Sequence, residues 1–419
     1  MTALLLSLAA VAGILLFAAV VGWMVAVSLF PGGASFRAER LGWGFVLGCA
    51  LLSAMVPISF VVGVTPGWMS FLILGGILFA AARFLPLPVG EGWGEGLTNA
   101  DPLRGPKQWT TRLLLALLLL GVALYALRAL TEPMWSNDYL AIWGFKGKTI
   151  FGARALPERF FRWPALGFSH PEYPLGLPFL YAGLASLLGR WDDHSLALLF
   201  PFFQGATLLV LFGWLRRRGA PWPLPLAAAA LLALFEPLYS GFLTGMAEVP
   251  LACGMLLFGT AFSDALDKTD RAALRRVGVA SLLIAATKNE GVFLAIVAAL
   301  VAGILIARRH SVRWPVSAAA LLPALAVTLL RRLTLGSVSL RDFDLSFLAP
   351  WGIEWLLPRL GESFHAALSE VVLPAWPGLL CVVVLFAVGR RTPHANRLLV
   401  LVAVCLAAYV FLPALAVPG

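Results

Sequence analysis

The chain has 419 residues, of which 60% are hydrophobic and only 12% are charged. A typical soluble domain carries about 25% charged residues, so this composition excludes an ordinary soluble protein and indicates a polytopic membrane protein. The net charge of +10 does not indicate a nucleic-acid partner, because the basic residues lie in short clusters between apolar runs.

Apolar runs long enough to cross a bilayer as helices recur along the chain. A backbone inside lipid must satisfy its own hydrogen bonds, so we expect an all-α polytopic membrane protein. The first run lacks the basic lead of a cleaved signal peptide and is expected to stay as a span. We predict about 12 transmembrane helices, at residues 3–30, 41–63, 68–88, 112–131, 195–215, 222–240, 244–263, 277–288 (starting as early as 272), 290–307, 314–331, 371–389 and 396–416.

A further apolar stretch, residues 174–189, is short and contains Pro178. Basic clusters such as Arg216, Arg217 and Arg218 mark the cytoplasmic side by the positive-inside rule. If residues 174–189 crossed the membrane, these clusters could not all lie on that side. We therefore expect a re-entrant or juxtamembrane helix there, with both chain termini outside.

Three regions follow from this topology. Residues 1–111 form an N-terminal addition of about three helices with a cytoplasmic linker. Residues 112–310 form a core that includes a first outer loop at 131–194. Residues 311–419 hold the C-terminal helices and a second outer loop at 331–370, and both loops are rich in Trp and Pro.

The predicted topology places four ionisable residues at one depth on the outer side. Asp138 follows the fourth span, Glu248 begins a later one, and Lys288 and Glu290 lie in a turn between two more. Any one of them alone is as readily a solvated residue at a helix end. Charged groups near the bilayer are costly, so four together, with opposite charges able to meet, favour a functional site.

The order of these residues carries a family resemblance. Asp138 in the first loop, the run HPEYPLGLPFLYAGLASLLG from His170, and TGMAEVPLA with Glu248 follow one another over about residues 112–310. In this the chain resembles the GT-C superfamily of integral-membrane glycosyltransferases, and more narrowly the bacterial group of protein mannosyltransferases and aminoarabinose transferases.

The resemblance implies a polyprenyl-phosphate-sugar donor, an acceptor that is a glycan, a lipid or a protein, and a role in building cell-envelope glycans. It places the protein in the bacterial inner membrane, with its active site on the periplasmic or extracytoplasmic face. It also implies a GT-C-like core in which the short segment after the first loop does not cross the membrane in several members.

Asp138 matches the first-loop acid of the family and Glu248 matches its second acid, whereas the other site residues are expected from the chemistry of the reaction. Asp138 is the expected general base of an inverting reaction, Glu248 orients the acceptor or the sugar, and Lys288 pairs with the donor phosphate. Lys146, Arg331 and Arg332 are further phosphate candidates, although the two arginines fit lipid headgroups equally well and Lys148 fits snorkelling. His170, Glu172, Tyr173 and Glu290 are expected to line the substrate pocket, with the alternative that His170 and Pro171 only shape a turn.

Two questions stay open at this level. Metal-dependent relatives carry two acids where this chain has one, so no cofactor is required, although a divalent cation is not excluded. A transporter or flippase of a lipid-linked or anionic solute would use the same charges. That alternative is disfavoured because ionisable residues are nearly absent from the middle of the predicted spans.

Overall fold

A computed structural model describes residues 2–30, 37–84, 108–157, 163–171, 173–220, 222–236, 238–267, 271–307 and 314–335, with positions 358, 361, 362 and 365. The regular secondary structure of these residues is helical throughout, as the composition predicts. The predicted spans 371–389 and 396–416, most of the second outer loop and Glu172 lie outside the described residues.

Six helices in the described part of the chain are long and apolar enough to cross a membrane: Leu5–Leu29, Arg37–Val61, Gln108–Thr131, Asp193–Arg217, Glu248–Asp267 and Trp314–Arg331. Each is close to a span expected from the sequence. The protein is therefore a polytopic helical membrane protein. The total of about 12 spans stays a prediction, since the other described helices are shorter or less apolar and two predicted spans are not described.

The N-terminal region consists of α1 (Thr2–Leu29), α2 (Arg37–Val61) and α3 (Trp68–Phe84). Here α1 and α2 approach backbone to backbone, because a Cβ on Gly22 would lie 2.0 Å from the Gly44 carbonyl oxygen. On the same seam a Cβ on Gly48 would lie 2.1 Å from the Ala18 carbonyl oxygen. Small residues permit such close helix packing in lipid, where burial of apolar surface does not drive association.

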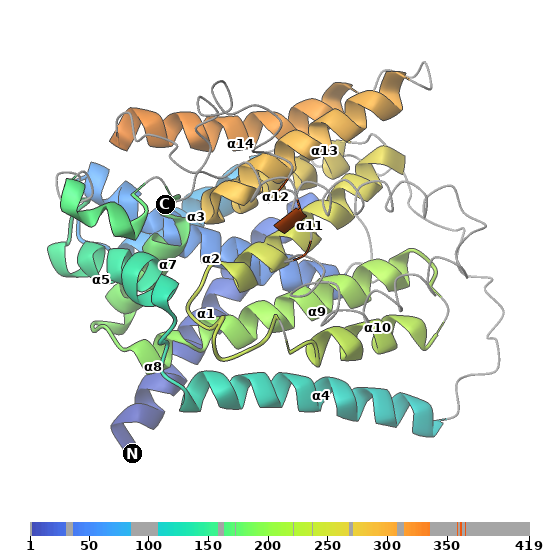
Figure 1. Ribbon diagram of the computed structural model, residues 1–419, viewed down its shortest axis with the longest axis horizontal. Helices are drawn as coiled ribbons and strands as arrows, with labels where there is room; N and C mark the ends of the chain where they lie inside the picture. The colour runs from blue at the N-terminus through green and yellow to red at the C-terminus, as the bar shows by residue number, and fades with distance from the viewer. Residues whose placement is uncertain are drawn as a thin grey trace.

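The other helices of the bundle run back and forth beside this region (Figure 1). In chain order they are α4 (Gln108–Thr131), α9 (Leu199–Arg217), α10 (Leu224–Ala233), α11 (Glu248–Asp267), α12 (Arg271–Thr287), α13 (Asn289–Ala307) and α14 (Trp314–Leu335). Between α4 and α9 lie the short helices η2 (Tyr139–Trp143), α5 (Gly144–Ala153), η3 (Pro164–Ser169), α7 (Gly176–Leu188) and α8 (Asp193–Leu196).

Two ends of the bundle are distinguished below. The short-helix end holds α5, α7 and α8, the end of α4 and the start of α11 (Figure 1). The arginine end holds the end of α9 and the start of α12, where Arg217, Arg218 and Arg276 lie.

One expected boundary differs in the structure. The predicted span 222–240 is helical over only 10 residues, Leu224–Ala233, and turns fill most of the backbone from there to α11. Apolar composition alone could not place this boundary, since it does not distinguish a helix from a buried turn. The span expected at 277–288, with a start as early as 272, corresponds to α12, which starts at Arg271.

The apolar stretch before α9 forms α7, which has 13 residues and a length of about 20 Å, too short to cross about 30 Å of hydrocarbon. Its first residue, Gly176, accepts a 2.7 Å hydrogen bond from Ser53 and lies against Ala286 near the end of α12. Just beyond its last turn, Asp192 accepts a 2.7 Å bond from Ser7 near the start of α1. Both flanks of α7 thus stay at the short-helix end.

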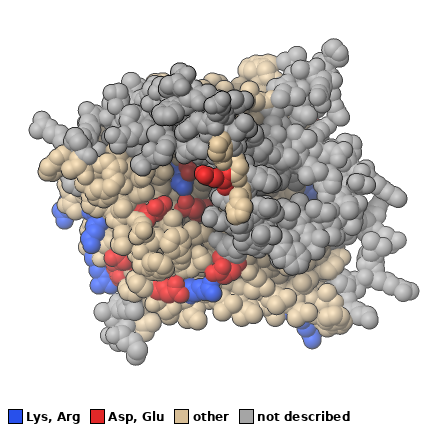
Figure 2. All heavy atoms as spheres, in the orientation of Figure 1, with Lys and Arg blue, Asp and Glu red and all other residues tan. Residues whose placement is uncertain are grey.

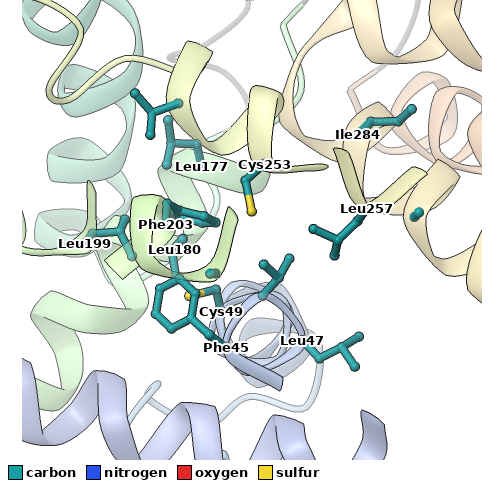
Figure 3. Packing of buried hydrophobic residues seen from close by; sticks show 14 of the residues in the cluster. Phe45, Leu47, Cys49, Leu177, Leu180, Leu199, Phe203, Cys253, Leu257 and Ile284 are labelled. Atoms are coloured by element: carbon teal, nitrogen blue, oxygen red, sulfur yellow. The ribbon is translucent and has the colours of Figure 1, made fainter. Parts of the chain in front are cut away.

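The main core lies where α2, α7, α9 and α11 meet (Figure 3). Phe45 of α2 packs edge to face on Phe203 of α9, with ring centroids 5.1 Å apart. Leu180 of α7 and Leu257 of α11 belong to the same buried cluster. This packing fixes α7 and the start of α11 relative to one another, and so positions the polar residues at their ends.

Candidate functional site

Asp138 lies at the short-helix end, where the chain leaves α4 and enters η2. It is the N-cap residue of η2, but its side chain makes no capping hydrogen bond. Neighbours hold the backbone in place, because the Tyr139 N–H donates to Ser136 Oγ at 3.3 Å and the Tyr139 hydroxyl donates to Asp193. Among the described residues, the half-buried Asp138 carboxyl has no hydrogen bond or ion pair.

Lys288 joins two carboxylates beside Asp138. Its Nζ lies 2.8 Å from Glu248 Oε1 and 3.0 Å from Glu290 Oε1. Glu248 opens α11, Lys288 separates α12 from α13, and Glu290 stands in the first turn of α13. The second oxygen of each glutamate is buried and has no hydrogen-bond partner in the described part of the chain. Figure 2 shows acidic and basic side chains gathered on one face of the molecule.

These groups lie close enough together to influence one another's ionisation. Burial raises the pKa of Asp138, and the nearby Glu248 carboxylate raises it further, as does Glu290. Lys288 and His170 act in the opposite direction and lower the pKa of Asp138. Burial alone would lower the pKa of Lys288, but Glu290 and Glu248 outweigh burial and raise it, so Lys288 stays charged.

His170 and Tyr173 form an aromatic stack beside this group. The His170 ring stacks on Tyr173 at a centroid distance of 4.8 Å, and Tyr173 stacks on Trp143 of η2 at 5.5 Å. Lys146 of α5 is fully buried and donates a hydrogen bond to the His170 carbonyl. That contact gives Lys146 a partner within the chain, and donor-phosphate binding by Lys146 stays a prediction.

Arg331 lies close to the same turn, because its guanidinium donates a 2.8 Å hydrogen bond to Asn289 Oδ1. The structure thus brings Asp138, Glu248, Lys288 and Glu290 together with His170 and places Arg331 next to them. The Arg332 side chain and Glu172 lie outside what the structure describes, so their expected roles stay predictions.

One part of this arrangement was missed in the sequence. Asp193 Oδ1 accepts hydrogen bonds from the Tyr139 hydroxyl, 54 residues earlier in the chain, and from Trp191 Nε1 at 2.8 Å. These contacts anchor η2 to α8 and so hold the residue next to Asp138. No local pattern pairs Tyr139 with Asp193, because the two meet only after α7 has folded between them.

A separate ionic cluster lies at the arginine end. Asp264 accepts from Arg217 at 2.6 Å, from Arg218 at 2.7 Å and from Arg276 at 3.2 Å. Arg217 also binds Glu39 at 2.7 Å, and Arg218 pairs with Asp267. Because these groups pair with one another, the arginine cluster is best understood as a structural connection between α2, α9, α11 and α12.

The described side chains also bear on whether the protein could bind a metal ion. In the described ranges no three side chains of His, Cys, Asp or Glu lie close enough together to hold a metal ion. The polar group at the short-helix end instead contains a lysine between two carboxylates. Independence from a divalent cation stays a prediction.

No family model, no curated protein and no solved structure matches the chain.

Proposed function

We propose that the protein is a glycosyltransferase that moves a sugar from a polyprenyl-phosphate-sugar donor to an acceptor hydroxyl at the short-helix end. The observation that carries this proposal is a half-buried Asp138 carboxyl whose ionisation is influenced by the nearby Lys288, which Glu248 and Glu290 hold at 2.8 and 3.0 Å. A base with no hydrogen-bond partner among the described residues and a fixed cation are the two groups that transfer from a lipid phosphate requires.

In the proposed reaction Asp138 takes the proton of the acceptor hydroxyl. The acceptor oxygen then attacks the anomeric carbon, and the bond from that carbon to the phosphate oxygen breaks. The electron pair of the broken bond stays on the lipid phosphate, which leaves as a phosphate monoester. Attack from the face opposite the phosphate inverts the configuration of the anomeric carbon.

The burial of Asp138 supports its assignment as the base. Burial raises the pKa of its carboxyl, and a base with a raised pKa holds an abstracted proton more readily. No hydrogen bond within the described residues occupies that carboxyl, so it is free to accept a substrate proton. Glu248 lies near enough to Asp138 to affect its ionisation. A group that orients the acceptor or the sugar for Asp138 would also have to lie near it.

Lys288 is proposed to neutralise the charge that develops on the leaving phosphate. Its ammonium stays charged because Glu290 and Glu248 raise its pKa, and those carboxylates also restrict where it can point. Arg331, held by Asn289 at 2.8 Å, is a second cation near this turn. With these cations in place, the proposed reaction does not require a divalent ion.

The finer points of topology belong to the same proposal. We place the short-helix end on the outer face of a bacterial inner membrane, about 12 spans in the membrane, and a GT-C-like core over residues 112–310. The short helix α7 supports this arrangement. If α7 does not cross the membrane, the basic clusters after α9 and α11 lie on the same side.

The test is sugar transfer by purified wild-type protein and Asp138→Asn from a panel of radiolabelled polyprenyl-phosphate sugars into membrane lipid and glycan. Asp138→Asn is expected to lower transfer by about 10²- to 10⁴-fold while donor binding persists. Glu236→Gln is the matched control, since it makes the same kind of change at an exposed acid whose ion pair in the described part of the chain is with Arg128 at 3.3 Å.

Equal transfer by wild type and Asp138→Asn would remove Asp138 from the mechanism. If wild type moved sugar from no donor, the transferase proposal would fail, and uptake of the same labelled lipids into sealed vesicles would then test the flippase alternative.

A further inference from the structure

We infer that Lys146 is a positioning residue that fixes His170 beside Asp138, and that it acts through this contact and not by binding the donor. The inference rests on the proposed function for the role of Asp138. It goes beyond that function by assigning Lys146, which sequence reasoning grouped with the phosphate ligands, to the support of the catalytic side chain.

The burial of Lys146 is the first argument. Its side chain is 0% exposed, whereas Lys148, two residues later on α5, is exposed. An ammonium group removed from water is costly unless hydrogen-bond acceptors surround it. The His170 carbonyl, 24 residues away in the sequence, is such an acceptor. The hydrogen bond from the buried Lys146 ammonium to this carbonyl links α5 to the turn that follows η3.

The backbone of His170 is the second argument. Its φ of 49° and ψ of 68° are left-handed, a conformation that residues with a Cβ rarely adopt. The His170 carbonyl accepts a hydrogen bond from the Lys146 ammonium and another from the Tyr173 N–H at 2.9 Å. Lys146 therefore holds a carbonyl that also closes the turn between His170 and Tyr173.

The ring of His170 gives this turn its connection to Asp138. It stacks on Tyr173, and Tyr173 stacks on Trp143, the last residue of the helix that Asp138 caps. The Lys146 ammonium lies 6.0 Å from the centre of the Tyr173 ring. One group of contacts thus joins the helix that carries Asp138 to the turn that carries His170.

His170 in turn acts on Asp138. It is one of four groups that affect the ionisation of the Asp138 carboxyl, the others being Glu248, Lys288 and Glu290. Those three belong to α11, the turn after α12, and α13, so only His170 of the four comes from the first loop. Release of the His170 turn should change the surroundings of Asp138 without touching the other three.

The first experiment measures how fast diethyl pyrocarbonate modifies His170 in purified protein, with mass spectrometry as the readout and exposed His194 as the internal reference. We expect Lys146→Met to speed modification of His170 at least about threefold, because the turn loses its anchor. Lys146→Arg, which keeps a charged donor, should restore slow modification, and Lys148→Met should leave the rate unchanged. The assay does not depend on enzymatic activity.

A second arm separates positioning from donor binding. In the transfer assay, Lys146→Met should lower kcat at least about tenfold while the KM for the donor lipid changes less than about threefold, and Lys146→Arg should recover most of kcat. A donor ligand would show the reverse, with a raised KM and little change in kcat. Lys146→Leu, which also removes the donor, takes the place of Lys146→Met if the latter is not recovered as monodisperse protein.

Unchanged modification of His170 in Lys146→Met, or in Lys146→Leu if it takes that place, would overturn the inference, as would a rise in donor KM with kcat preserved. If wild type transferred no sugar, the proposed function would fail, but faster modification of His170 would still establish the anchor. The two failures are therefore distinguishable.

Discussion

The two ends of the bundle hold buried charges in opposite ways. At the arginine end Asp264 is surrounded by three arginines, and Arg217 has a second carboxylate in Glu39, so charges of both signs are paired. At the short-helix end Lys288 is shared by two glutamates, and the nearby Asp138 carboxyl makes no hydrogen bond within the described residues. Paired charges stabilise a fold, whereas a charge left without partners is available for a substrate.

This contrast predicts that the two ends respond differently to the same kind of mutation. The largest effect on stability is expected for Asp264→Ala. It leaves three arginines without their shared carboxylate, and removing one partner of a buried ionic group typically costs about 3–5 kcal/mol. Thermal unfolding of purified protein in detergent should show a clear drop in midpoint. Asp138→Asn should unfold like wild type, and equal destabilisation by the two would refute the contrast.

The next largest effect is expected for Lys288→Met. A hydrogen bond to a charged group contributes about 1.5–3 kcal/mol, so its loss should weaken binding of a polyprenyl-phosphate sugar by about tenfold to hundredfold. Donor binding by purified protein measures this. Lys148→Met, at an exposed lysine of α5, is the matched control, and similar loss in both variants would mean that the effect is general attraction to anionic lipid.

A third prediction concerns the pH dependence of transfer. Burial and Glu248 raise the pKa of Asp138, so the carboxylate is lost at a higher pH than that of an exposed aspartate. Transfer should therefore fall as the pH is lowered through this raised pKa. Glu248→Gln removes a charge that raises the pKa of Asp138, so the acid limb of the pH–rate profile should move to lower pH. This shift is expected whatever effect the substitution has on the maximal rate.

The profile of log kcat/KM against pH for the two proteins decides the point. Lys288→Met should shift the acid limb of the profile in the opposite direction. Lys288 lowers the pKa of Asp138, so its loss should move the acid limb to higher pH. Shifts in the same direction for both variants would contradict the assignment of the limb to Asp138.

The smallest effect is expected at a charge pair that belongs to neither cluster. Arg128 and Glu236 lie 3.3 Å apart with side chains 42% and 60% exposed. Exposed pairs contribute less than about 1 kcal/mol, so Glu236→Gln should change neither thermal unfolding nor transfer measurably. A large loss of stability would show that this pair is less accessible in the membrane than its exposure indicates.

Much of the helical framework was predictable from the sequence. The positions of α1, α2, α4, α9, α11 and α14 follow from apolar run length. The short apolar stretch forms a helix of only 13 residues, and its re-entrant or juxtamembrane placement stays a prediction. The grouping of Glu248, Lys288 and Glu290 was also expected, because alternating spans bring every second connection to the same end. The short extent of α10 was not, since a turn buried in protein has the same apolar composition as a helix.

The amino-acid sequence by itself determined that this protein is helical and crosses the membrane, because backbone groups in lipid have few other ways to satisfy their hydrogen bonds. It also determined which of the chain segments that connect the helices carry charged residues. Only the tertiary structure decided the partners of those charges: Lys146 with the His170 carbonyl, Tyr139 with Asp193, and Arg276 with the Leu29 carbonyl 247 residues away at 2.9 Å. The physical reason is that apolar faces distinguish poorly between neighbours in lipid, so close packing of specific side chains sets which helices meet.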